Sequence, residues 1–132
     1  MSFKIVKSPK AWWPVTFSGV SEDGAIVQNS FEMRFRILDE DEQAAIEAEF
    51  RDLGEQEGAD ALIPSKVSAD LVMRIAEDWR GVCVDDGTEA GASLPFSAEN
   101  VPTLMKVPNV FRAIGDAYRA CRAGVPEARR GN

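Results

Sequence analysis

The alternation of hydrophobic and polar residues predicts β structure in the N-terminal third of the chain. From Phe31 to Ile37, apolar side chains occupy every second position and charged side chains lie between them. A period of two indicates a strand with one buried face and one face in water. Residues 12–17 favour a further strand, in which Pro14 requires a sheet edge or a strand start. A turn signal at residues 21–24 separates the two, so we predict an antiparallel sheet of two to three strands.

Beyond this sheet the hydrophobic period changes to about 3.6, which predicts helices. Asp39 and Glu42 have the spacing of a capping box at a helix start, and Gly54 and Gly58 are expected to end that helix. Its expected apolar stripe is Ile46, Phe50 and Leu53. Ser65 or Ser68 is expected to cap a second helix. The expected stripe of this helix is Leu71, Ile75 and Trp79.

The C-terminal half is expected to hold a very short strand at residues 82–84 and then a helical segment that contains Pro102. Pro108 is expected in the first turn of a last helix, which Gly124 ends. The wide apolar stripe of this last helix comprises Val110, Phe111, Ile114, Ala117, Tyr118 and Cys121. The predicted fold class is therefore α+β, with a small N-terminal sheet followed by three to four helices. We expect one domain over residues 1–126 and a disordered tail over residues 127–132.

Composition and charge narrow the possible functions. The 132 residues include 15 Lys and Arg against 22 Asp and Glu, a net charge of −7, which argues against nucleic-acid and membrane-surface partners. The chain contains no histidine, so imidazole acid–base catalysis and imidazole-ligated zinc are excluded. Cys83 and Cys121 have no metal-binding or redox spacing and are expected to be free thiols. No signal-peptide core or membrane-length apolar stretch is present, so a cytoplasmic location is expected.

The nearest approach to a metal site is the acidic segment around Asp85, Asp86 and Glu89. Counted from Asp85, the position that needs the twelfth-residue glutamate of a calcium loop is Phe96, so the pattern fails. A turn stabilised by Asp side chains is the favoured interpretation. A small metal-dependent enzyme that uses these carboxylates remains the least favoured alternative, and no cofactor or catalytic residue is predicted.

Aromatic side chains offer candidate partner-binding residues. Trp12 and Trp13 are adjacent, so on a strand they point to opposite faces and one of them faces outward. Tryptophan is common among the anchors of protein interfaces, although packing within a local cluster would also explain it. The amphipathic last helix provides two further candidates, Phe111 and Tyr118.

Two blocks of the sequence together resemble the tail assembly chaperones of siphophages and prophages. The first block runs from Trp13-Pro14-Val15 through Asp23-Gly24 to the strand at Phe31–Leu38. The second and more specific block contains Trp79-Arg80-Gly81-Val82, Asp86-Gly87, Leu94-Pro95-Phe96-Ser97, Glu99-Asn100, Leu104, Val107-Pro108, Val110, Ala113 and Tyr118. Cys83, the loop at residues 88–93 and Pro102 depart from the family pattern.

The resemblance implies a non-enzymatic role in viral morphogenesis in the cytoplasm of a bacterial host. Such chaperones bind and solubilise the long, helical, hydrophobic tape measure protein before the tail tube assembles around it. The resemblance also implies a homo-oligomer and, through a longer frameshifted form, contact with the tail tube protein. A head–tail connector or tail-terminator subunit, which would be structural and would stay in the virion, is the alternative.

Overall fold

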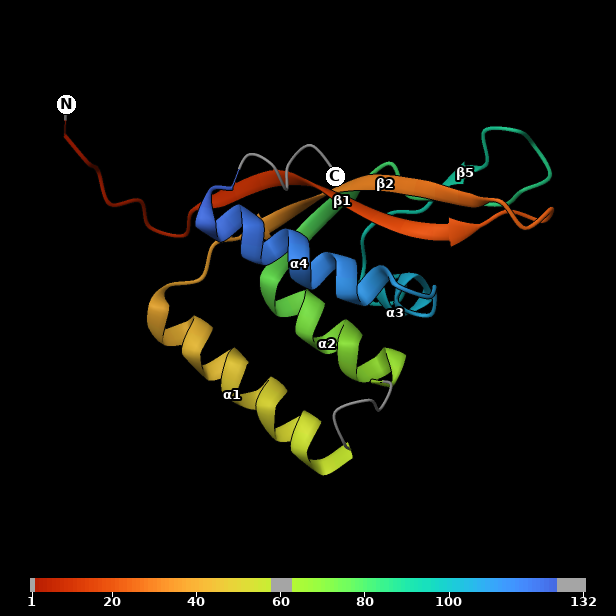
Figure 1. Ribbon diagram of the computed structural model, residues 1–132. Helices are drawn as coiled ribbons and strands as arrows, with labels where there is room; N and C mark the ends of the chain where they lie inside the picture. Colours follow the sequence, from red (N-terminus) through yellow and green to blue (C-terminus); the bar gives the residue numbers. More distant parts are fainter. Residues whose placement is uncertain (1, 58–62, 126–132) are drawn as a thin grey trace.

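Residues 2–57 and 63–125 are described by the computed structural model, in which helices cover one face of a three-stranded antiparallel sheet (Figure 1). This arrangement confirms the predicted α+β class and the N-terminal position of the sheet. The tail expected at residues 127–132 lies outside the described residues. In Figure 1 the sheet, the pair of helices α2 and α4, and the helix α1 follow one another from top to bottom.

A long hairpin forms the greater part of the sheet. Strand β1 (Lys10–Val20) pairs with β2 (Ile26–Arg36) without interruption, from Lys10 opposite Arg36 to Val20 opposite Ile26. The predicted turn joins them, with the Ser21 N–H donating to the Ala25 carbonyl at 2.8 Å and Gly24 in the left-handed region at φ +88°. Because Gly24 has no Cβ, it adopts this conformation without strain.

The position of Pro14 agrees with the prediction that it lies on an edge strand. The sheet order is β1-β2-β3, so β1 has one free edge. The Pro9 carbonyl accepts a hydrogen bond from the Ile37 N–H at 2.9 Å, which means that odd-numbered residues of β1 direct their backbone groups toward β2. Pro14 is even-numbered, so its missing N–H is on the free edge and removes no bond of the ladder.

Strand β3 (Ala76–Arg80) corrects the prediction that Trp79 lies on a helix. Helix α2 (Ser65–Ile75) ends at Ile75, and the chain enters β3 directly to pair with β2. Trp79 lies opposite Met33 and is 5% exposed, and its Nε1 donates to the Leu94 carbonyl at 2.6 Å. A helix that continued α2 and the strand β3 would both bury Trp79, so the hydrophobic pattern of these residues does not distinguish the helix from the strand. The open edge of β2 offers ladder hydrogen bonds that favour the strand.

Helix α1 (Glu40–Glu57) starts with the predicted capping box. The Glu42 N–H donates to Asp39 Oδ1 at 2.8 Å, and the Asp39 N–H donates to Glu42 Oε1 at 3.2 Å. The helix continues through Gly54, so the prediction that Gly54 ends it is wrong. One interior glycine costs only about 1 kcal/mol relative to alanine, which neighbouring helical residues offset. Gly58 and the side chains of Phe50 and Leu53 lie outside the description.

The predicted cap of α2 is also wrong. Pro64 occupies the N-cap position, and Ser68, one turn inside the helix, donates its hydroxyl hydrogen to the Ser65 carbonyl at 3.1 Å. Ser65 is the first helical residue and Ser68 lies further in, so neither is at the N-cap position, and no side-chain hydrogen bond caps this end of the helix.

The remaining elements are short, apart from the last helix. Strands β4 (Cys83–Val84) and β5 (Ala92–Ser93) form a two-stranded antiparallel ribbon, and β4 is the short strand expected at residues 82–84. Helix α3 (Val101–Met105) follows, with Pro102 in its first turn. Helix α4 (Val110–Ala123) ends at Gly124 in the left-handed conformation, as predicted. Pro108 precedes the N-cap residue Asn109 and is not in the first turn, because Asn109 at φ +73° turns the chain before the helix begins.

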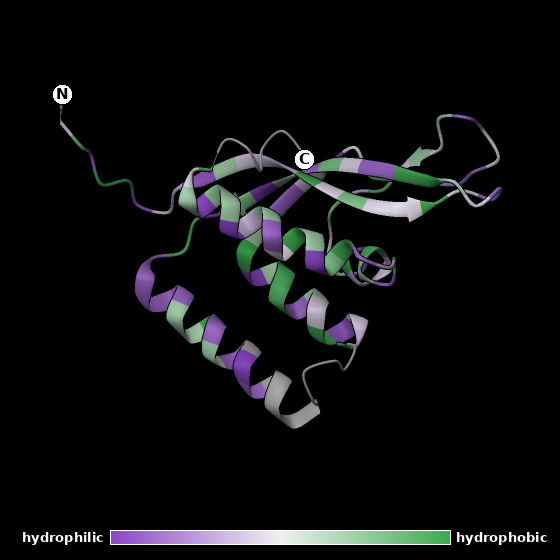
Figure 2. Ribbon diagram, viewed as in Figure 1, coloured by the Kyte–Doolittle hydropathy of each residue, from purple (hydrophilic) through white to green (hydrophobic). Residues whose placement is uncertain are grey.

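The core lies between the sheet and the helices α2, α3 and α4. Val15, Met33 and Phe35 on the inner face of the sheet are fully buried, and the Phe35 ring meets the Tyr118 ring edge-on with centroids 5.4 Å apart. Strongly hydrophobic residues lie on α2 and α4, the sheet is mixed, and α1 is mainly hydrophilic (Figure 2). Helix α1 therefore contributes little to the core among its described side chains, with only Gln43 and Ile46 buried.

A candidate partner-binding groove

A groove between α1, α2 and α4 lies on the helical side of the molecule. We call it the helical groove. Its volume is about 230 Å³, and apolar side chains form most of its surface. Its lining residues are Gln43, Ile46, Glu47, Leu71, Ile75, Phe111, Ile114, Gly115, Tyr118 and Arg119. Sites for small molecules usually have volumes of about 300–1,000 Å³, so a groove of this size suits one or two apolar side chains of a partner better than a cofactor.

Helix α4 supplies one wall because its sequence repeats at helical spacing. Phe111, Gly115 and Tyr118 lie at i, i+4 and i+7 and therefore on the same face. Because Gly115 has no side chain, the middle of this wall does not project into the groove. A Cβ built there would be in van der Waals contact with the Arg119 guanidinium alone, at 3.6 Å or more, so only the end of one flexible side chain lies above the glycine.

Helix α1 forms the opposite wall, and several of the contacts that its described side chains make with the rest of the domain are polar. Arg122 Nη2 donates to Glu40 Oε1 at 2.7 Å, and Arg74 pairs with Glu49. Both pairs are on the surface, where an ion pair typically contributes less than about 1 kcal/mol. Ile46 is the one apolar side chain of α1 that is buried among those described. The α2 and α4 side of the groove is therefore firmly packed in the core, whereas the described side chains hold the α1 side by fewer apolar contacts.

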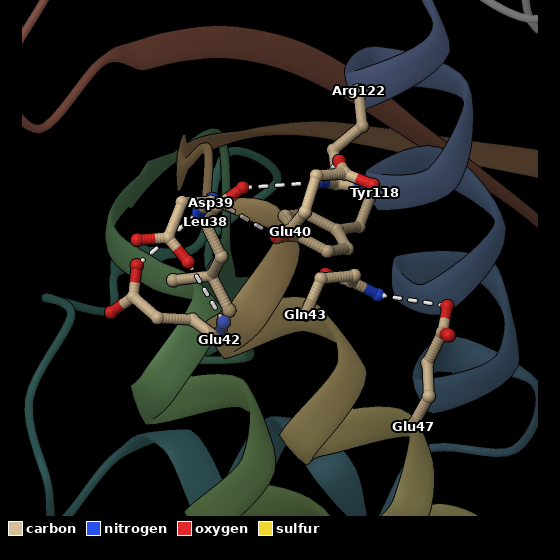
Figure 3. Close-up of polar contacts among 8 residues, drawn as sticks. All are labelled: Leu38, Asp39, Glu40, Glu42, Gln43, Glu47, Tyr118 and Arg122. Carbon is tan, nitrogen blue, oxygen red and sulfur yellow. Dashed lines mark hydrogen bonds and ion pairs between the residues drawn. The ribbon is translucent and has the colours of Figure 1, made fainter.

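Gln43, near the N-terminal end of α1, places a polar group in this apolar groove (Figure 3). Its side-chain amide donates from Nε2 to Glu47 Oε1 at 3.2 Å, and a carboxylate can only accept, so the orientation of the amide is fixed. The opposite atom, Oε1, is buried and accepts no hydrogen bond from any residue that the structure describes. Such an acceptor favours a ligand that brings an N–H or O–H group.

The upper end of the groove is organised around Tyr118 and Arg122 (Figure 3). The Leu38 N–H donates to the Tyr118 hydroxyl at 3.3 Å, while Arg122 donates to the Leu38 carbonyl at 3.0 Å. Burial raises the pKa of Tyr118 above its ordinary value, so the phenol is neutral at physiological pH. Burial likewise raises the pKa of the nearby Cys121 thiol, which disfavours the reactive thiolate. These groups position the connection into α1.

The four aromatic residues expected to bind a partner fall into three places. Phe111 and Tyr118 line the same helical groove. Trp13 faces the helices and packs against the core, whereas Trp12 is on the opposite face of the sheet, 4.2 Å below the Arg80 guanidinium. The outward tryptophan is therefore Trp12, and it does not share a site with the groove.

Sequence reasoning missed Gln43 and Gly115. Gln43 lies three residues before Ile46 and so shares its buried face, which is the signal that could have identified it. Gly115 interrupts the apolar stripe of α4, but a lone glycine in a helix gives no indication of a groove.

The acidic segment near residue 86 forms the predicted turn. The Gly87 N–H donates to Asp85 Oδ1 and the Thr88 N–H to Asp86 Oδ1, both at 2.9 Å. The hydrogen bonds from Thr88 lower the pKa of Asp86. Across residues 2–57 and 63–125, no three or more His, Cys, Asp or Glu side chains gather in a way that could hold a metal ion.

Comparisons with known proteins add no family assignment. No family model matches the chain, and no curated protein and no solved structure is significantly similar to it. Within the described part of the chain, none of the helices has the length and apolarity needed to cross a bilayer.

Proposed function

We propose that this protein is a phage tail assembly chaperone that binds and solubilises the tape measure protein, with the helical groove as its client-binding site. The two-block sequence resemblance supports the client class. The observation that carries the site is an apolar groove containing one buried, unpartnered acceptor, Gln43 Oε1.

The groove suits a helical client for physical reasons. An amphipathic helix docks by placing apolar side chains at i, i+3 or i+4 into a hydrophobic groove. A volume of about 230 Å³ admits such anchors, and Phe111, Leu71 and Ile75 supply the apolar surface that receives them. A client Ser, Thr or Asn beside the anchor satisfies Gln43 Oε1, which adds selectivity to an otherwise non-directional contact.

The charge of the protein fits a solubilising role. An aggregation-prone client stays dispersed when its apolar surface is covered and the complex carries a large net charge. The net charge of −7 supplies this repulsion between complexes. The proposed activity is non-catalytic and takes place in the cytoplasm of the bacterial host. Further partners in this proposal are other copies of the chain and, through a frameshifted longer form, the tail tube protein.

The decisive experiment is co-expression with the proposed client, a tape measure protein, measuring the soluble fraction of the client. Gly115→Met fills the open space of the groove from the α4 wall, while Gly115→Ala is the matched control that leaves most of the groove open. We expect the wild type and Gly115→Ala to keep the client soluble and Gly115→Met to lose that activity while remaining folded. If the client is equally insoluble with and without the wild-type protein, the chaperone proposal is wrong. If Gly115→Met is as active as Gly115→Ala, the client binds elsewhere.

A further inference from the structure

The charge of this protein is unevenly distributed along the chain. Helix α1 contains eight acidic residues and one arginine, a net charge of −7, which equals the net charge of the whole sequence. The rest of the chain is therefore neutral overall, and its acidic and basic residues can form local regions of either sign.

A basic region occupies the face of the sheet that points away from the helices, which we call the outer sheet face. Trp12 lies directly opposite Arg34 in the ladder, Lys10 opposite Arg36, and Arg80 opposite Glu32, so these side chains share one face. The outer sheet face as defined here comprises Lys10, Trp12, Glu32, Arg34, Arg36, Glu77, Asp78 and Arg80.

Cations outnumber carboxylates on this face, four against three. The carboxylate of Glu77 is within 4 Å of three cations: its oxygens lie 3.1 Å from Lys10 Nζ, 3.2 Å from Arg34 Nε and 3.7 Å from Arg36 Nε. One carboxylate cannot neutralise three cations, and the side chains of Arg34 and Arg36 are 43% and 47% exposed. This surface can therefore accept further carboxylates.

The outward face of α1 offers carboxylates of the required sign. Asp41 and Asp52 are eleven residues apart, about three helical turns, so they lie on the same face. Both are exposed, and they project away from the side of α1 that carries the buried Gln43 and Ile46. Ala45 and Ala48 lie between the two aspartates on the same face, and their small side chains allow close approach.

We propose that the outer sheet face of one copy of this chain binds the outward face of α1 of a second copy. The two surfaces are on opposite sides of the domain, with α2 and α4 between them (Figure 1). One copy cannot join its own two surfaces, so the contact is head-to-tail and builds rings or open arrays. Trp12, held under Arg80 at 4.2 Å, is the anchor at the centre, since Trp and Arg are enriched at the energetic centres of interfaces. This interface goes beyond client binding, because it uses no residue that lines the helical groove.

Two charge-reversal variants test the interface. One, Arg34→Glu with Arg36→Glu, makes both surfaces acidic; the other, Asp41→Lys with Asp52→Lys, makes both basic. Sedimentation velocity over a protein concentration series is the measurement. We expect the wild type to associate, with the association weakened about tenfold or more between 50 and 500 mM NaCl, and each variant alone to be monomeric. An equimolar mixture of the two variants should associate again, because each then meets a surface of opposite sign.

Lys4→Glu with Lys7→Glu is the matched control, since it changes the net charge by the same amount as the arginine reversals but lies outside both surfaces. This control should associate like the wild type. A wild type that is monomeric at every concentration and salt overturns the proposal, as does association that is independent of salt. Failure of the mixture to associate, with both variants folded by circular dichroism, also overturns it. If the arginine variant does not fold because Glu77 loses its partners, the salt dependence of the wild type together with the Asp41→Lys, Asp52→Lys variant still decides. None of these measurements involves a client, so their failure is separate from failure of the chaperone proposal.

Discussion

Replacing Gln43 by methionine tests whether this residue is retained for binding at a cost in stability. Methionine has nearly the same length and helix propensity as glutamine, so the change mainly removes the polar amide. In the folded protein, Gln43 Oε1 is buried without a donor from any described residue, while Nε2 bonds to Glu47 at 3.2 Å. The substitution therefore removes one unfavourable group and one favourable hydrogen bond together.

The two effects differ in size. A buried acceptor that lacks a donor costs about 1–3 kcal/mol, and a typical hydrogen bond contributes about 0.5–1.5 kcal/mol. The expected net result is stabilisation by about 1 kcal/mol. At an unfolding entropy of about 2.1 cal/mol/K per residue, a chain of 132 residues should gain about 4 °C in melting temperature. Binding of the client should weaken, by roughly three- to tenfold, because its donor loses the acceptor.

Urea and thermal denaturation, each followed by circular dichroism and by tryptophan fluorescence, measure the stability change. Gln43→Glu is the control of opposite sign, because it places a buried charge beside Glu47 and should destabilise the fold. A Gln43→Met protein less stable than the wild type would refute the reasoning, since it would mean that the amide oxygen has a donor in the folded state. Greater stability with unchanged client affinity would instead remove Gln43 from the binding site.

Three further predictions concern the fold. Gly115→Ala should raise the free energy of unfolding by about 0.5–1 kcal/mol, because the helix gains an alanine and the new Cβ meets only the flexible Arg119 side chain. Unchanged or lower stability in urea denaturation would contradict the ordinary contact distance between that Cβ and Arg119. Phe35→Ala should lower the free energy of unfolding by about 3–5 kcal/mol, because a fully buried ring that contacts Tyr118 is lost. Phe35→Leu should lower it clearly less, and equal effects of the two substitutions would argue against close packing around Phe35. A hydrogen bond from Lys10, with the charges of the neighbouring cations, lowers the pKa of Glu77, so its stabilising effect is present above the ordinary carboxyl pKa and is lost as the pH falls through the lowered value. The melting temperature of Glu77→Gln should therefore fall less than that of the wild type between about pH 5 and pH 3, and parallel curves would show that the carboxylate has no such role.

Much of the fold depends on interactions between residues close in sequence, and these could be predicted. The alternation at residues 31–37 identifies a half-buried strand, and the capping box at Asp39 and Glu42 forms as expected. Gly124 ends α4 and the acidic turn closes on Asp85 and Asp86 for the same reason. In the capping box, the Gly124 cap and the acidic turn, the hydrogen-bond partners are at most a few residues apart, so the residue types alone select the conformation.

The functional surfaces depend on contacts between distant parts of the chain. Trp79 fits a helical stripe as well as a strand, and the open edge of β2, more than forty residues earlier, decides in favour of the strand. The sequence indicates that one of Trp12 and Trp13 faces outward, but only the packing of α4 and α2 on one face of the sheet selects Trp12.

The helical groove follows the same rule. Phe111 and Tyr118 could be placed on one face of α4 from their spacing, and nothing in that spacing shows which helices lie across from them. The arrangement of α1 and α2 brings Gln43 and Ile46 to the same groove, in which only the flexible Arg119 side chain lies above Gly115. Local patterns therefore determine which side chains share a face, because that depends on the period of the backbone. The tertiary structure alone determines what each face meets, because burial and charge complementarity arise between elements far apart in the sequence.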